Sequence, residues 1–444
     1  METNIDAYLF PVPSVPVGIK CRINKKTARH KNGFSRRGIR VLCVRDSQQV
    51  NTIEAREMPN LIFGLLACFL ITFIVVKSAR LGGGIGLDNQ LDGVQKMHAT
   101  AVPRVGGIAV ALAVALTLAL GALLGSNPRV EVFKLLLCAL PVFLGGIIED
   151  FTKQVSPAAR LLCAIVSAAI GDFALGAVVD RVDLPLIDSL LVYSPIALGL
   201  TLLMVSGLTN AFNLIDGFNG LAGGVAVLML ASIGFVAHQV DDWLILSVSL
   251  TMIGAILGFL VWNYPFAAIF LGDGGAYFIG FTIAELVVLL IARHPNVSAW
   301  YAVVVTIYPI FETIFTIYRR RIVRGCAAGE PDGIHLHTLI FRRMVRRAGH
   351  PETTRQRTRR NARTSPYLWT ISLISIVPAT FLWNNEVALF ATAMTFIAIY
   401  VWLYASIVKF RAPRWLVTYM PRDSLPAPNE TPPNHPAEQP SQAE

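Results

Sequence analysis

Apolar runs long enough to cross a lipid bilayer are the feature that most constrains this chain. A helix needs about 20 residues to span the hydrocarbon core, and eleven apolar runs of about that length follow residue 58. They lie at residues 60–79, 105–125, 133–149, 158–178, 193–209, 220–237, 243–262, 275–291, 299–318, 366–384 and 387–408. With 54% hydrophobic and 15% charged residues and a mean hydropathy of +0.57, the composition excludes a soluble globular protein. We predict an all-α, polytopic integral membrane protein with about eleven transmembrane helices.

The distribution of positive charge predicts which way the helices face. Between Arg319 and Ser365 there are thirteen arginines, no lysine and three acidic residues. The positive-inside rule places this loop in the cytoplasm, and it explains the basic charge better than a nucleic-acid interface does. Counting back through alternate spans puts further connections on the same face: 80–104, 150–157, 210–219 and 263–274.

The two ends of the chain differ from the apolar body. Residues 1–57 are basic and lack the apolar core of a signal peptide, so we expect a disordered or mis-annotated extension. Translation would then begin at Met58, the alternative being a genuine basic extension. Residues 58–410 form the membrane domain with its arginine-rich loop at 319–365, and the proline-rich segment 411–444 is predicted to be a disordered tail.

Four polar side chains recur at a spacing of three between two apolar runs. They are Asn210, Asn213, Asp216 and Asn219. Residues three apart are neighbours on one helix face, so these groups can converge on one ligand. Polar groups at a membrane boundary cost free energy unless they bind something or line water. The pattern predicts a binding site at the cytoplasmic face.

Three further carboxylates fall in cytoplasmic connections. Glu149 and Asp150 end the third apolar run, and Asp273 lies between glycines directly before a helix. A hard cation such as Mg²⁺ is held by one or two carboxylates together with substrate phosphates. The alternatives are a solvated acidic pair and an aspartate that caps a helix.

Cationic residues are predicted to bind phosphate at the same face. Lys96, His98 and Arg104 precede the pair Gly106–Gly107, where small residues let backbone N–H groups approach an anion; a plain basic loop entering a helix is the alternative.

The arginine-rich loop contains a second group of cations. His335 and His337 form a His-x-His pair, and no third zinc ligand lies nearby in the sequence. With the arginines of the loop they predict a phosphate pocket.

In this order, the motifs resemble the polyprenyl-phosphate N-acetylhexosamine-1-phosphate transferase superfamily, of the glycosyltransferase 4 type. That group includes initiating GlcNAc-1-phosphate transferases and the phospho-MurNAc-pentapeptide translocase. The resemblance covers about residues 58–410 and rests above all on Asn210-Ala-Phe-Asn-Leu-Ile-Asp216-Gly and Phe270-Leu-Gly-Asp273-Gly-Gly. Supporting matches are Lys96-x-His98, Pro103-Arg104-x-Gly106-Gly107, Pro309-x-x-Glu312-Thr and the His335-x-His337 loop.

The resemblance implies transfer of a sugar-1-phosphate, most simply N-acetylhexosamine-1-phosphate, from a UDP-sugar to polyprenyl phosphate with release of UMP. It implies Mg²⁺, or Mn²⁺ in its place, on Asp273, Asp216 and Asn210. The implied catalytic residues are Asp150, Glu149, Asp216, Asp273, Lys96, His335 and His337. The implied substrate-binding residues are Asn210, Asn213, Asn219, Asn263, Phe270, His98, Arg104 and Lys153.

Two positions depart from the family pattern. Glu149 stands where the family usually has Asp, and Asn219 replaces an Asp common in bacterial members, which puts the nucleotide contacts there in question. The resemblance implies a multi-pass protein of the bacterial inner membrane that acts without nucleic acid in the synthesis of a cell-surface glycan; a homodimer is left open. A membrane transporter and a catalytically silent member of the family are the competing hypotheses.

Overall fold

The computed structural model describes residues 19–24, 40–45, 47–80, 102–125, 128–323, 325, 334–347, 354–411, 413 and 416–420. Its first helices are α1 (Ser47–Arg80), α2 (Gly106–Leu123), α3 (Arg129–Thr152), α4 (Pro157–Leu175), α5 (Pro185–Leu191), α6 (Ser194–Ile215) and α7 (Leu221–Gln239). They are followed by α8 (Trp243–Asn263), α9 (Gly272–Arg293), α10 (Ala299–Val305), α11 (Ile307–Tyr318), α12 (Leu336–Leu339), α13 (Thr354–Ala362), α14 (Ser365–Phe381) and α15 (Glu386–Val408). Short π-helical segments occupy Arg319–Val323 and Ile340–Met344.

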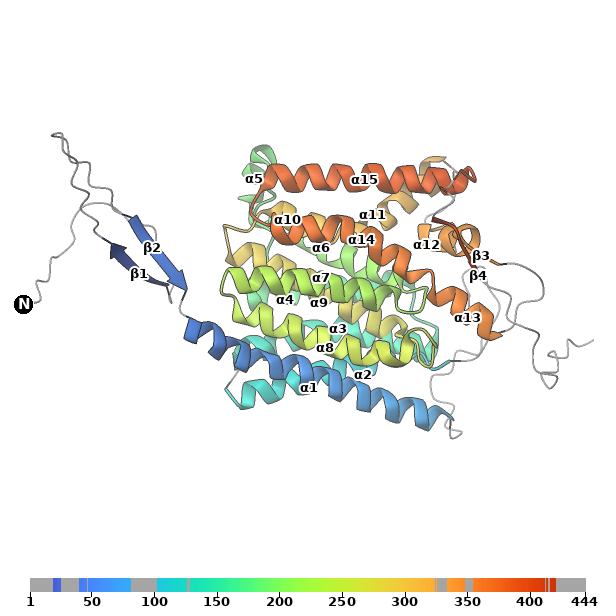
Figure 1. Ribbon diagram of the computed structural model, residues 1–444, viewed down its shortest axis with the longest axis horizontal. Helices are drawn as coiled ribbons and strands as arrows, with labels where there is room; N and C mark the ends of the chain where they lie inside the picture. Colours follow the sequence, from blue (N-terminus) through green and yellow to red (C-terminus); the bar gives the residue numbers. More distant parts are fainter. Residues whose placement is uncertain are drawn as a thin grey trace, which may run out of the picture.

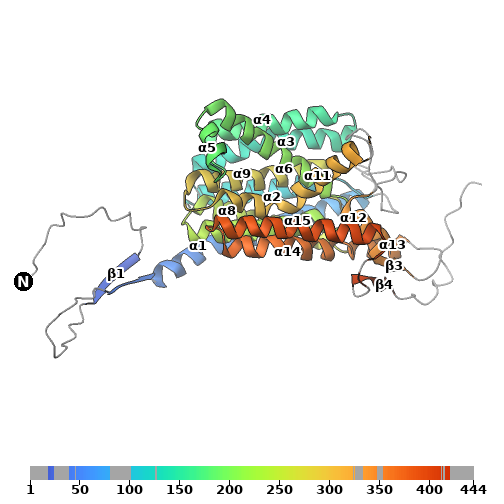
Figure 2. The same cartoon turned by 90° about the horizontal axis from the view of Figure 1, so that it is seen from above.

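The long helices lie side by side and run in alternating directions (Figures 1 and 2). In Figure 1 the C-terminal ends of α3, α6 and α8 lie at the same end of the bundle as the N-terminal ends of α7 and α9. The short helices α12 and α13 also lie at this end, which we call the site end. The alternation brings the expected polar connections together, as the sequence predicted.

The prediction of an all-α, polytopic membrane protein is confirmed. Within the described residues, nine helices are long and apolar enough to span a membrane. The pair α10 and α11 passes the same test as one broken span bent by 73°, and α14 has 17 residues. The total of eleven spans stays a prediction.

Two local expectations along the chain were wrong. The fifth apolar run was expected to end at residue 209, but α6 continues to Ile215, so Asn210 and Asn213 lie on its last turns and not in a loop. The helix accommodates Asn210 because its Nδ2 donates to the Ser206 carbonyl one turn back, at 2.8 Å. The expected loop at 179–192 also contains α5, with Pro185 in its first turn.

Short strands occur near both ends of the chain. Within the predicted extension, β1 (Ile19–Asn24) and β2 (Arg40–Arg45) pair antiparallel, and α1 begins at Ser47. A translation start at Met58 stays a prediction. Within the predicted tail, β4 (Thr418–Met420) pairs in parallel with β3 (Val345–Arg347).

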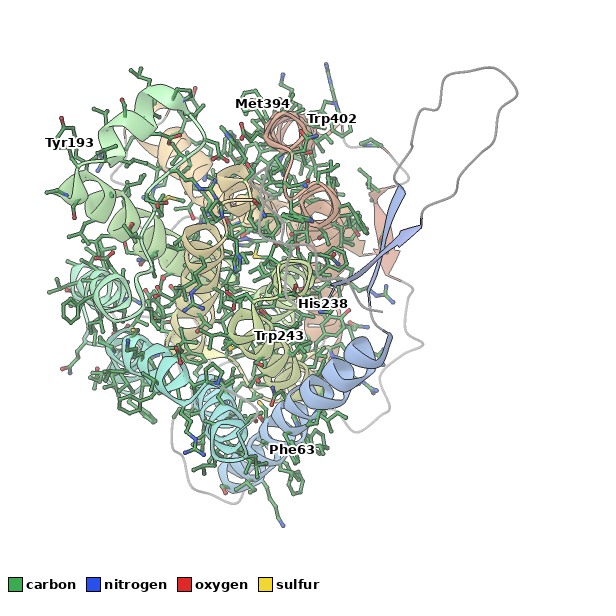
Figure 3. The ribbon with its side chains drawn as sticks, turned by 90° about the vertical axis from the view of Figure 1, so that its left-hand side faces the viewer. Phe63, Tyr193, His238, Trp243, Met394 and Trp402 are labelled. Carbon is green, nitrogen blue, oxygen red and sulfur yellow. The ribbon has the colours of Figure 1, made fainter. Side chains whose placement is uncertain are left out.

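The outer surface of the bundle is apolar, as expected for contact with lipid. Figure 3 looks along the helices from the end opposite the site end, and Phe63, Tyr193, Met394 and Trp402 lie at the periphery. These side chains are between 44% and 64% exposed. Since large exposed apolar surfaces are unfavourable in water, this surface suits a hydrocarbon environment.

Glycines set the close packing of α1 against α8. A Cβ on Gly254 would lie 2.1 Å from the Leu61 carbonyl oxygen, and one on Gly258 would lie 2.4 Å from that of Leu65. Gly254 and Gly258 are four residues apart and form a small-xxx-small pair, which lets helix backbones approach closely in a bilayer. The contact holds the first span on the core.

Replacing Gly254 by leucine is expected to detach α1 and to lower the melting temperature of the detergent-purified protein by several degrees. The matched control is Gly207→Leu, because nothing lies within 4 Å of a Cβ built at Gly207. Thermal unfolding of the two variants would show a loss for Gly254→Leu alone. Equal melting temperatures would mean that this contact does not hold α1.

Candidate active site

A cavity of about 440 Å³ opens among the helix ends at the site end. Its walls come from the ends of α3, α4, α6, α8 and α9, from the segments before α2 and α9, from the turn Asp216–Asn219, and from residues 335–338, here called the histidine segment. Ten of the residues predicted from the sequence line it: Arg104, Glu149, Asn213, Asp216, Asn219, Asn263, Phe270, Asp273, His335 and His337.

Other predicted residues lie elsewhere. Asp150 is buried behind the wall, and Asn210 lies outside the lining. Lys153 is exposed in a left-handed conformation (φ 57°) just after α3, also outside the lining. Lys96 and His98 fall outside the described residues.

The Asp150 carboxylate holds the first turn of α9. Its Oδ1 accepts the N–H of Asp273 at 2.9 Å, and its Oδ2 accepts the N–H of Gly274 at 2.9 Å. The N-terminus of a helix has unsatisfied N–H groups and a partial positive charge, so a carboxylate is stabilised there. Both Asp150 oxygens are occupied and its side chain is 1% exposed, so Asp150 positions Asp273. The prediction that Asp150 is a catalytic group stays a prediction.

The glycine pair Gly106–Gly107 serves packing. Their N–H groups donate to the carbonyls of Phe270 (2.9 Å) and Leu271 (2.7 Å), so the interpretation that they point at phosphate was wrong. A Cβ on Gly107 would lie 2.2 Å from the Gly275 nitrogen. Only residues without a Cβ allow this approach, and the contact fixes the start of α2 against the start of α9.

Asp273 carries two arginine contacts. Arg104 Nη2 donates to its Oδ1 at 3.1 Å, and Arg160 Nη1 donates to its Oδ2. Arg160 lies on the first turn of α4 and was not among the predicted site residues. An ionisable side chain close to the start of an apolar span was the available signal, because such residues are normally functional or paired.

Asp216 follows the end of α6 and faces the same cavity. Loss of hydration raises the pKa of Asp216 from its ordinary 3.8 to about 7; Arg104 opposes this rise, whereas the carboxylates of Asp273 and Asp150 add to it. A nearby cation would favour the charged form.

Glu312, buried in α11, anchors the histidine segment. Its Oε1 accepts the N–H of Leu336 at 3.0 Å, and its Oε2 accepts the hydroxyl of Tyr400 at 2.7 Å. His335 Nδ1 lies 3.3 Å from Oε1, and the His335 ring stacks on His337 with centroids 5.1 Å apart. Glu312 therefore holds both imidazoles at the cavity wall.

The remaining carboxylate and one amide are engaged by the protein. Glu149 Oε2 accepts the N–H of Val155 at 2.8 Å, which closes the turn after α3. Asn263 Oδ1 accepts the N–H of Gly220 at 2.7 Å, and its Nδ2 donates to the Ile269 carbonyl at 2.8 Å. Asn263 thus holds two cavity segments in place, and its predicted contact with substrate would have to share these bonds.

Asn219 is different. Its side chain lines the cavity and the residue is 1% exposed, yet neither Oδ1 nor Nδ2 has a hydrogen-bond partner among the described residues. An unsatisfied buried amide costs about 1–3 kcal/mol per group. A ligand with a donor and an acceptor would satisfy it.

The cavity provides some, but not all, of the ligands that the predicted metal ion needs. Asp216 and Asp273 share the cavity with the amide of Asn213, a set of oxygen donors suited to Mg²⁺. Within the part of the chain that is described, no three His, Cys, Asp or Glu residues cluster as a complete metal site. One or two carboxylates suffice when substrate phosphates supply the other ligands, and the two arginines on Asp273 already supply positive charge there.

These features define a membrane-embedded enzyme with a charged cavity at one end of its helices. The family model for glycosyl transferase family 4 matches residues 132–291. A probable undecaprenyl-phosphate N-acetylglucosaminyl 1-phosphate transferase of Bacillus subtilis (strain 168) is 32% identical over 289 residues, which cover 64% of this chain and 77% of that protein. The chain belongs to this family of polyprenyl-phosphate N-acetylhexosamine-1-phosphate transferases and is a phosphotransferase.

More distant relatives carry a similar name. The undecaprenyl-phosphate alpha-N-acetylglucosaminyl 1-phosphate transferase of Escherichia coli O157:H7 is 28% identical over 291 residues (63% of this chain, 76% of that protein). The protein of the same name from Yersinia pestis is 29% identical over 296 residues (64% and 76%).

Replacing Asp150 by asparagine leaves one acceptor oxygen for two N–H groups. We expect the free energy of unfolding to fall by about 1–2 kcal/mol, as for a lost helix cap. Glu149→Gln is the matched control, since an amide oxygen can still accept its single N–H. Thermal unfolding in detergent should therefore show a lower melting temperature for Asp150→Asn than for Glu149→Gln. Equal decreases in melting temperature would contradict the capping role of Asp150.

The raised pKa of Asp216 makes stability depend on pH. The folded state keeps a proton that the unfolded chain has released, so the free energy of unfolding falls as pH rises from about 4 to about 7. Asp216→Asn removes this dependence and is expected to be more stable than the wild type at pH 8 and similar to it at pH 4. Melting temperatures of the two proteins from pH 4 to pH 8 test the effect. A difference in melting temperature that stays constant over this range would contradict it.

Proposed function

We propose that this protein transfers N-acetylhexosamine-1-phosphate from a UDP-sugar to undecaprenyl or another polyprenyl phosphate. The products are UMP and a polyprenyl-diphosphate-linked sugar. The cavity carries the proposal, since it combines carboxylates, cations and one unsatisfied amide where apolar helices end. The names of the curated relatives support the acceptor and suggest N-acetylglucosamine as the sugar.

The nucleotide base would occupy the part of the cavity lined by Asn219 and Phe270. A uracil edge offers both donors and acceptors, which suits the free amide of Asn219. The half-buried ring of Phe270 offers a face for stacking.

The diphosphate would lie toward the cations. Arg104, Arg160, His335 and His337 line the same cavity, and arginine binds phosphate oxygens in a bidentate manner. Arg104 and Arg160 both donate to the Asp273 carboxylate. Phosphate oxygens can exchange with that carboxylate as partners of the guanidinium groups.

Mg²⁺ would be held by Asp273 and Asp216, with Asn213 beside them. When bound, the ion would neutralise charge on the phosphate oxygens and polarise the phosphorus. The chain's own cations would share that neutralisation and align the two substrates.

The reaction needs little proton transfer. A phosphate monoester has a second pKa of about 6, so the polyprenyl phosphate is largely a dianion at neutral pH. One of its oxygens attacks the β-phosphorus of the UDP-sugar, the bond from that phosphorus to the bridging oxygen breaks, and UMP leaves with the electron pair. No general base is required, which agrees with the capping bonds that occupy Asp150.

The site end would face the cytoplasm of a bacterium, in the inner membrane. Helices α12 and α13, which belong to the arginine-rich loop of the sequence, lie at this end, and the positive-inside rule favours that loop on the cytoplasmic side. UDP-sugars are water-soluble, so a site among helix ends can admit them. The product would begin a cell-surface glycan.

A transporter is disfavoured by the position of the polar residues. Transporters of the inverted-repeat type bind substrate near the bilayer midplane, whereas this cavity is built from helix ends and turns. A catalytically silent member would be expected to lose carboxylates, but Asp216 and Asp273 both line the cavity.

Replacing Asp273 by asparagine is expected to lower turnover at least about a thousandfold, because a charge group facing the reacting phosphates is lost. The assay uses purified protein, labelled UDP-N-acetylglucosamine, undecaprenyl phosphate and Mg²⁺, with transfer of label to lipid as the readout. Asp188→Asn is the control, since the Asp188 carboxylate in α5 accepts the N–H groups of Val182 and Leu184 in the loop before α5, outside the cavity lining. Retained turnover by a folded Asp273→Asn variant would show that the transfer does not require the Asp273 carboxylate.

A further inference from the structure

The backbone of Asn219 is held by side chains from a distant part of the chain. Its N–H donates to Asn361 Oδ1 at 2.8 Å, and its carbonyl accepts the Ser365 hydroxyl at 2.6 Å. Both partners are fully buried. The two bonds span 142 and 146 residues of sequence.

The next residue is held in the same way. The Gly220 carbonyl accepts the indole N–H of Trp369 at 3.1 Å. Gly220 has φ +74°, a conformation that favours glycine. A Cβ on Gly224 would lie 2.2 Å from Trp369 Nε1, so the glycine makes room for the indole.

Asn361, Ser365 and Trp369 follow one another at a spacing of four. The chain stays close to helical between α13 and α14, with Thr364 at φ −74° and ψ −38°. Residues four apart share one helix face, so one face presents all three groups to the Asn219–Gly220 peptide. We call these three residues the Asn219 clamp.

The clamp acts on a buried residue of the cavity wall whose amide is oriented to bind a ligand. The Asn219 side chain has no hydrogen bond of its own among the described residues, so its position is set by its backbone. Several bonds to that backbone reduce the conformational freedom that a ligand would otherwise have to remove on binding. Asn361 and Ser365 are fully buried and Trp369 is partly buried, so water has little access to these bonds.

We propose that Asn361, Ser365 and Trp369 are positioning residues that preorganise Asn219 for the nucleotide of the donor. The proposal rests on the function proposed above. It makes the α13–α14 segment, which begins at the end of the arginine-rich loop, a determinant of donor affinity. The acceptor lipid and the phosphoryl transfer itself do not depend on the clamp.

The decisive variant is Ser365→Ala, which leaves the buried Asn219 carbonyl without its hydroxyl donor. Its matched control is Ser372→Ala on the same helix, whose buried hydroxyl donates to the Leu368 carbonyl at 2.8 Å within α14. We expect Ser365→Ala to raise KM for the UDP-sugar about fivefold to fiftyfold. Its kcat should stay within about twofold, with KM for the polyprenyl phosphate unchanged, because donor binding is weakened equally in the ground state and in the transition state.

Two more variants test the clamp without touching Ser365. Trp369→Phe keeps a ring but removes the N–H that binds the Gly220 carbonyl, and Gly224→Ala pushes the indole away from it. Both should weaken binding of UMP to the purified protein by calorimetry, measured without lipid acceptor. Ser372→Ala should bind UMP as the wild type does.

The outcomes separate this proposal from the proposed function. If the wild type transfers no label from any UDP-sugar and binds no UMP, the function fails. If the wild type is active and Ser365→Ala matches Ser372→Ala in donor KM and UMP affinity, the clamp proposal fails alone. It also fails if Ser365→Ala lowers only the melting temperature, or raises both KM values equally, since a purely structural role predicts these results.

Discussion

The bond between the Asp150 carboxylate and the first turn of α9 is the interaction on which the site depends. It joins the end of α3 to the start of α9 and thereby places Asp273 at the cavity wall. Two arginines then meet Asp273, and the glycine contact between α2 and α9 allows one of them, Arg104, to approach. Burying several charges at a membrane boundary is costly unless each is paired. Asp273, Arg104 and Arg160 meet that condition because they pair with one another.

Periodicity and composition were sufficient to predict the general architecture. Apolar runs of about twenty residues can only be helices in a bilayer, because each backbone N–H and C=O must be satisfied within its own segment. The alternating direction of these helices then places every second connection at one end. For that reason Asp216, Asp273 and the His335–His337 pair could be expected in one site, although they are far apart in the sequence.

The roles of individual residues depended on long-range contacts that a sequence does not display. Asp150 and Asn263 carry chemistry-bearing side chains, yet their oxygens are occupied by backbone N–H groups from other segments. Gly106–Gly107 fits an anion site by local pattern but is used for helix packing. Only the folded chain shows that Arg160 contacts Asp273 and that the Asn219 clamp binds the Asn219–Gly220 backbone.

The proposed reaction transfers the β-phosphate of the UDP-sugar to the lipid together with the sugar. The direct measurement supplies UDP-N-acetylglucosamine labelled on the sugar and, separately, on the β-phosphate or the α-phosphate, together with undecaprenyl phosphate. We predict that sugar and β-phosphate labels reach the lipid in equal amounts while the α-phosphate label appears in UMP. Sugar label in the lipid without the β-phosphate would indicate simple glycosyl transfer and would contradict the account, as would the absence of lipid product with any UDP-sugar.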